Sequence, residues 1–169
     1  MIPKYKTILY TTDMAPNSFP VFRHALGVAQ RYGAKVHILH VVEEMDPSHQ
    51  NYLAALIGEE TYKKRAEKLK TEIVEALKKR LKEFADEQLN GHPEQIDAVA
   101  GIEVVHGYAV AQILKMAEEV NADLLVFGTH GQGIFDQNLL GSVVHRVLRR
   151  TQWPVLVVPV VEEPKKVQS

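Results

Sequence analysis

The sequence predicts an α/β fold with a parallel sheet and helices on both of its faces. Short apolar or β-branched segments alternate with segments of helical period along the chain, and this alternation is typical of that fold class. The 169 residues, 46% of them hydrophobic, are enough for one core and contain no apolar stretch that could span a membrane. We therefore expect one domain over residues 1–169, with 162–169 as a polar tail.

The first strand is expected at Thr7–Thr12, where apolar and β-branched residues follow one another. A loop follows, at whose end Ser18 can cap a helix. This helix has an apolar face and stops at Gly33. The second strand is expected at Lys35–Val42.

A longer connection, residues 43–60, separates the second strand from a long helix. It contains the apolar run Tyr52–Ile57, which we interpret as a lid or a partner surface. From residue 61 to about residue 89, apolar residues recur every three or four positions between charged ones, and this period predicts a surface helix packed on the sheet. Residues 90–93, Asn-Gly-His-Pro, end it.

The second half of the chain repeats the alternation with three more strands and two helices, giving five strands in all. In order they are a strand near Val99–Val105, a helix at Ala109–Val120, a strand at Leu124–Thr129, a helix at Ser142–Arg150 and a final strand at Val155–Val160.

A glycine motif follows the fourth strand. Gly128 and Gly131 let the backbone turn tightly and approach a ligand without an intervening Cβ. Nine residues later, Gly141 and Ser142 stand where a helix begins and where backbone N–H groups have no helical partner. This spacing predicts a cradle for a phosphate or a similar anion.

Composition argues against several classes of function. The 20 basic and 21 acidic residues give a net charge of −1, which disfavours nucleic acid as a partner. The absence of cysteine excludes disulfides, thiolate metal sites and cysteine nucleophiles. The amino terminus lacks the features of a secretion signal, so we expect a cytoplasmic protein.

Eight histidines raise the question of a metal site. His37 and His40 are three apart on a strand and point to opposite faces, which is poor geometry for chelation. His106 and His130 both lie near predicted carboxyl ends of strands. A polar wall or a phosphate contact is favoured there over a metal.

Three elements of the chain together resemble the nucleotide-binding branch of the universal stress protein family. They are Asp13 after the first strand, Leu39-His40-Val41 at the end of the second, and Gly128-x-x-Gly131-x9-Gly141-Ser142 followed by Val143. The resemblance extends from the first strand to Val160. It implies a five-stranded sheet in the order 3-2-1-4-5, with ATP across the ends of strands one and four.

The resemblance also implies roles for individual residues. Asp13 is placed beside the ribose or the base edge, Val41 against the adenine, and Phe127 beside the ribose. The glycine loop and the start of the following helix are expected to bind the phosphates. Mg²⁺ or Mn²⁺ is expected to be held mainly by phosphate oxygens and water. The expected nucleotide-binding set is Thr12, Asp13, Val41, Phe127, Gly128, His130, Gly131, Gly141, Ser142 and Val143.

Two departures from the family pattern concern the phosphates. The loop 132–140 has no Lys or Arg and contains Asp136, whereas many relatives carry a basic residue after the second glycine. Val144 stands where a hydroxyl residue is common. The expected ligand is ATP, but these two changes favour AMP, ADP or a different adenine nucleotide in its place.

The sequence has no Gly-Lys-Ser/Thr loop and no evident arginine finger, so a regulatory binding module is favoured over an efficient hydrolase. A weak ATPase and a ligand-free structural stress protein remain as alternatives.

The last strand predicts self-association. Val155–Val160 is apolar on both faces and comes last in the expected strand order, so it lies at an edge of the sheet with unpaired backbone groups. We expect a homodimer through this strand, and the family resemblance implies the same arrangement about a two-fold axis.

Overall fold

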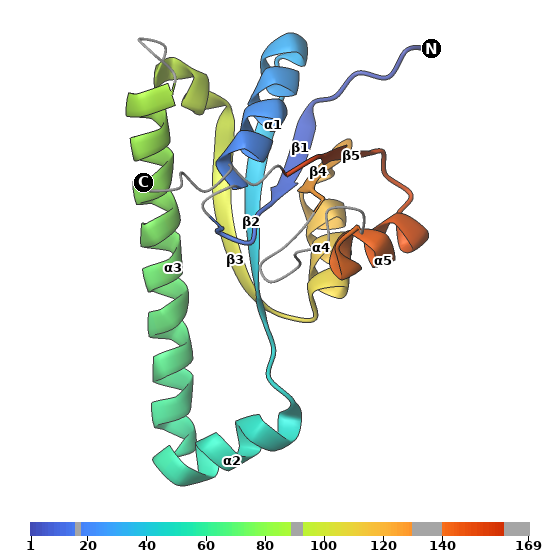
Figure 1. The fold of residues 1–169 in the computed structure, drawn as a ribbon. Coiled ribbons are helices and arrows are strands. Elements are labelled where there is room, and N and C mark those ends of the chain that lie inside the picture. Colours follow the sequence, from blue (N-terminus) through green and yellow to red (C-terminus); the bar gives the residue numbers. More distant parts are fainter. Residues whose placement is uncertain (16–17, 89–92, 130–139, 161–169) are drawn as a thin grey trace, which may run out of the picture.

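The computed structural model describes residues 1–15, 18–88, 93–129 and 140–160, and it confirms the predicted α/β fold (Figure 1). The elements are β1 (Thr7–Thr11), α1 (Ser18–Tyr32), β2 (Lys35–Glu43), α2 (Pro47–Ile57), α3 (Glu59–Gln88), the 3-10 helix η1 (Pro93–Ala98), β3 (Val99–Gly107), α4 (Ala109–Glu119), β4 (Leu124–Gly128), α5 (Ser142–Arg150) and β5 (Val155–Val158). The turn expected at residues 90–92 and the polar tail 162–169 lie outside the described residues.

The sheet has the expected strand order β3-β2-β1-β4-β5, and every pair of neighbours is parallel. The chain first builds outward from β1 to β3 and then returns to the other side of β1 to add β4 and β5. The order therefore reverses between β1 and β4. In an open parallel sheet this reversal leaves a crevice at the carboxyl ends of the two strands.

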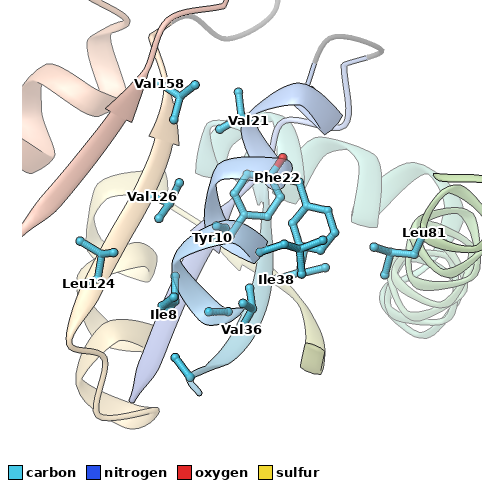
Figure 2. Packing of buried hydrophobic residues seen from close by; sticks show 14 residues of the cluster. Ile8, Tyr10, Val21, Phe22, Val36, Ile38, Leu81, Leu124, Val126 and Val158 are labelled. Carbon is cyan, nitrogen blue, oxygen red and sulfur yellow. The ribbon is translucent and has the colours of Figure 1, made fainter. Parts of the chain in front are cut away.

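Alternation along the strands divides the core into two layers. Ile8 and Tyr10 of β1 pack in one layer with residues of α1 and with Leu81 of α3, whereas Leu9 packs with residues of α4 and α5 on the opposite face. Figure 2 shows the first layer, in which Tyr10 and Phe22 lie next to each other with ring centroids 5.3 Å apart. Helices thus cover both faces, as a fully buried parallel sheet requires.

The start of β1 is fixed against the start of β4 by Asp123. One carboxylate oxygen of Asp123 accepts hydrogen bonds from Lys6 N at 2.7 Å and Thr7 N at 2.9 Å. The backbone N–H of Asp123 donates in return to Thr7 O at 2.8 Å. These contacts set the register in which Ile8 lies opposite Leu124, and so determine how the far ends of β1 and β4 face each other.

The connection at residues 43–60 differs from the expectation, because most of it is the helix α2. Asp46 caps this helix by accepting a hydrogen bond from Ser48 N at 2.7 Å, and Pro47 takes the first turn, where a missing N–H costs nothing. Gly58, at φ 90°, separates α2 from α3.

No residue of α2 is buried. Tyr52 and Leu56 are 63% and 62% exposed. Figure 1 shows α2 and the first part of α3 reaching beyond the end of the sheet, so this segment contributes little to the core.

The last strand ends at Val158 and not at Val160 as predicted. Its partner β4 already ends at Gly128, and the N–H of Val160 bonds to the side chain of Thr129 at 3.0 Å in place of a strand backbone. Among the residues that the structure describes, no helix is long and apolar enough to cross a membrane.

Candidate functional site

A pocket of about 560 Å³ lies at the carboxyl ends of the central strands. This volume is in the range of small-molecule sites. Most of the residues selected from the sequence line it: Thr12, Asp13, Val41, Phe127, Gly128, Gly141, Ser142 and Val143. His130 and Gly131, the other two, lie outside the described residues.

The turn after β1 leaves one carboxylate oxygen of Asp13 without a partner. Asp13 Oδ1 accepts a hydrogen bond from Ala15 N at 3.0 Å, which is the Asx turn that an aspartate at a strand end favours. Asp13 Oδ2 is buried and has no hydrogen-bond partner within the described part of the chain. A buried carboxylate oxygen without a hydrogen bond lowers the stability of the folded protein, and a donor group on a ligand would remove this penalty.

The β2 side of the pocket is formed by His40 and Val41. His40 Nδ1 lies 2.9 Å from the carbonyl oxygen of Thr12. Since a carbonyl oxygen only accepts, His40 carries a proton on Nδ1 and uses it to hold the end of β1. His40 therefore helps to shape the pocket wall, a role that differs from the chelation considered above.

The start of α5 supplies backbone donors. Gly141 is the N-cap, and within the part of the chain that the structure describes no side chain caps the helix. The first bond of the helical ladder runs from His145 N to Gly141 O at 2.9 Å, so the N–H groups of Ser142, Val143 and Val144 precede it. All three residues line the pocket. N–H groups that precede the helical ladder and the positive end of the helix dipole favour an anion at this position.

Thr129 joins the parts of this rim by three hydrogen bonds. Its carbonyl oxygen accepts from Gly141 N at 2.7 Å, and its N–H donates to Val158 O at 3.0 Å. Its hydroxyl accepts from Val160 N at 3.0 Å. The end of β4, the start of α5 and the end of β5 are thus held together at one residue.

Ser18 and Tyr10 also line the pocket. Ser18 was expected to cap α1, but it is the first residue of the helix and its hydroxyl donates to Ala15 O at 2.6 Å. The Tyr10 hydroxyl donates to Ser18 O at 2.8 Å. Burial raises the pKa of Tyr10 to about 12, so this phenol is neutral at physiological pH.

A metal site formed by protein side chains is not seen in residues 1–15, 18–88, 93–129 and 140–160, where no three His, Asp or Glu side chains gather suitably. His106 is exposed on β3 and does not line the pocket. The arrangement can accept one hydrogen bond through Asp13 and can donate several to an anion at α5.

Several lining residues were not selected from the sequence, among them Tyr10, Ser18, His40 and Ala109. Tyr10 and His40 lie within one or two residues of Thr12 and Val41 on the same strands, so the carboxyl-end position was a usable signal for them. Ala109 carried no such signal, because its place depends on how α4 packs.

Known proteins resemble this chain over most of its length. The family model described as the universal stress protein family matches residues 4–159. Universal stress protein MJ0531 of Methanocaldococcus jannaschii is 35% identical over 163 residues, which cover 96% of this chain and 85% of the relative. Universal stress protein MJ0577 of the same organism is 30% identical over 158 residues, covering 91% of this chain and 94% of that protein.

Solved structures show the same fold. The structure of MJ0577 superposes with a TM-score of 0.68 at 26% identity and covers 95% of this chain and 100% of that one. A universal stress protein solved in complex with cAMP has a TM-score of 0.55 at 25% identity and covers 94% and 100%. Together, the match of the family model over most of the chain and the identity to these relatives show that the chain belongs to the universal stress protein family.

Proposed function

We propose that residues 1–169 form an adenine-nucleotide-binding regulatory module. The observation that carries this proposal is that one pocket combines Asp13 Oδ2 with the start of α5, and that no described residue pairs with this oxygen or caps this helix through its side chain. The carboxylate oxygen accepts a hydrogen bond from a neutral donor, and the helix start donates to an anion. A nucleoside phosphate has neutral donors on its base and ribose at one end and an anionic phosphate at the other.

The apolar lining suits the base. Val41, Phe127 and Ile113 provide apolar surface in the same pocket. In the proposed pose the adenine lies against Val41 and gives an N–H, or the ribose gives an O–H, to Asp13. The phosphates then lie at Ser142 and Val143, with Mg²⁺ or Mn²⁺ on the phosphate oxygens. The related structure solved with cAMP, itself an adenine nucleotide, supports this assignment.

The proposal assigns binding and conformational regulation, with slow hydrolysis or none. The described lining residues include no Lys or Arg that would stabilise charge on a transferring phosphoryl group. A nucleotide that binds more tightly to one conformation of the protein shifts the population toward that conformation and changes the surface shown to a partner.

Titration calorimetry with ATP, ADP, AMP and cAMP, each with and without magnesium, tests the proposal. The matched variants are Asp13→Asn, in the pocket, and Asp97→Asn, in η1 outside it. We expect Asp13→Asn to weaken binding by about 10-fold to 100-fold, the value of one hydrogen bond to a charged group. The melting temperature of the free protein changes little, because the Asn oxygen still accepts from Ala15 N. Absence of both heat and thermal stabilisation with the wild-type protein contradicts the proposal.

We also propose that the protein is a homodimer through β5. The carbonyl oxygens of Pro154 and Val158 accept from Leu125 N of β4 and from Thr129 N just after it, at 3.0 Å each. Backbone groups alternate sides along a strand, so those of Val155 and Val157 point away from the sheet. An edge strand with free donors and acceptors can pair with its copy across a two-fold axis.

Sedimentation velocity at micromolar concentration tests the dimer. Val157→Pro removes an outward N–H and leaves the bonds to β4, so we expect a folded monomer. Val157→Thr keeps the N–H and the β-branched shape and serves as the control. A wild-type particle of 19.0 kDa contradicts the proposal.

A further inference from the structure

The turn that carries Asp13 contains a strained residue. Met14 has φ 65°, in the left-handed region that residues other than glycine rarely adopt because Cβ approaches the backbone. Such a conformation persists only where the surroundings enforce it, and it occurs preferentially at functional sites.

Hydrogen bonds hold this turn from several sides. The N–H of Met14 donates to Thr12 Oγ1 at 3.0 Å, and that of Ala15 donates to Asp13 Oδ1 at 3.0 Å. Both are local bonds within the turn. The carbonyl oxygen of Met14 accepts from the guanidinium of Arg80, which lies 66 residues later in the chain.

Arg80 is well placed to fix the turn. It belongs to α3, and its neighbours Leu77 and Leu81 are buried at 3% and 7% exposure. Figure 2 shows Leu81 on α3 beside the core layer that includes Tyr10 and Phe22. The half-buried Arg80 side chain therefore extends from a helix segment anchored in the core, and its charged donor makes a strong hydrogen bond.

We propose that Arg80 is a positioning residue for the nucleotide site. By holding the Met14 carbonyl, it keeps the turn in its left-handed conformation. Asp13 then satisfies Oδ1 within the turn and presents Oδ2 unpaired. Rotation of the Met14 backbone to an ordinary conformation would move this carbonyl away from Arg80 and re-aim the preceding carboxylate. The inference rests on the proposed function, since it gives Asp13 Oδ2 a ligand to bind.

Calorimetric titration with AMP on matched variants tests this role. We expect Arg80→Leu to weaken AMP binding by about tenfold, which corresponds to the loss of one charge-assisted hydrogen bond. Arg80→Lys keeps one charged donor and recovers part of the loss. Lys82→Leu changes an exposed residue of the same helix and serves as the control. Adding Met14→Gly to Arg80→Leu restores affinity, because glycine adopts the left-handed conformation without strain.

A double-mutant cycle separates positioning from a general structural effect. If Arg80 acts through Asp13, Arg80→Leu costs little affinity in the Asp13→Asn background. An equal loss in both backgrounds overturns the proposal.

Methyl NMR of the free protein labelled at methionine gives a readout that does not depend on nucleotide. We expect the Met14 signal to move in Arg80→Leu and to stay in place in Lys82→Leu. An unmoved Met14 signal overturns the claim that Arg80 holds the turn. If the Met14 signal moves but the wild-type protein binds no adenylate, the turn is held as described and the proposed function, with the ligand role of Arg80, is overturned.

Discussion

Replacement of Asp123 by alanine tests how strongly the register of β1 against β4 is fixed. The change removes one carboxylate oxygen that accepts two backbone hydrogen bonds, from Lys6 N and Thr7 N. It leaves the bond from Asp123 N to Thr7 O in place. The perturbation is therefore confined to the side chain, and the strand pairing itself remains.

The expected loss of stability follows from these two bonds. Hydrogen bonds to a charged group contribute roughly 1.5–3 kcal/mol each when buried. The bond from Lys6 is exposed and the bond from Thr7 is partly buried, so we expect a smaller total of about 2 kcal/mol for Asp123→Ala. Asp123→Asn retains a neutral acceptor and costs about half as much.

Urea denaturation followed by circular dichroism at pH 7 measures this difference. We expect the midpoint of Asp123→Ala to fall with an unchanged slope, because the surface exposed on unfolding stays the same. Glu118→Ala, an exposed change on α4, is the control and should stay within about 0.5 kcal/mol of wild type. An Asp123→Ala protein as stable as the control would refute the assigned role of the carboxylate.

Two further predictions concern stability. Burial raises the pKa of Tyr10 from 10.0 to about 12. The unfolded chain therefore loses this proton first, and the free energy of unfolding falls as the pH rises through that interval. Tyr10→Phe lacks this contribution, so urea titrations at pH 9 to 12 should show a shallower decline; identical slopes contradict the assignment. Gly27 lies inside α1, where an added Cβ would have nothing within 4 Å, whereas Gly107 has φ 143° and its Cβ would come 3.0 Å from Gln112 Cγ. Gly27→Ala should gain about 0.5–1 kcal/mol and Gly107→Ala should lose about 1–3 kcal/mol, and equal signs in thermal denaturation would refute this contrast.

The sequence predicted the sheet and most helix limits because the relevant signals are local. Gly33 adopts φ 64° directly after α1, as a helix-ending glycine does, and α5 covers Ser142–Arg150 as predicted. The helix α2 was missed because Tyr52–Ile57 is a continuous apolar run without a polar face. Asp46-Pro47, an N-cap followed by proline at the first position, was the local signal that could have revealed it.

The candidate site was predictable where a motif carried it and not elsewhere. The turn at Asp13 and the helix start at Gly141 are encoded by neighbouring residues. The contact of Arg80 with Met14 depends on how α3 packs, and in the sequence Arg80 is one of many charged residues of a long helix. The left-handed conformation of Met14 also had no signal, since methionine does not favour it.

The bond between Thr129 O and Gly141 N has an energetic consequence for recognition at the rim. Bringing two distant points of a chain together carries an entropic cost that grows with the number of residues between them. In this protein the entropic cost arises during folding, because Thr129 O and Gly141 N already lie 2.7 Å apart in the folded chain. A molecule entering the pocket therefore need not close this ring, and more of its contact energy remains available as affinity.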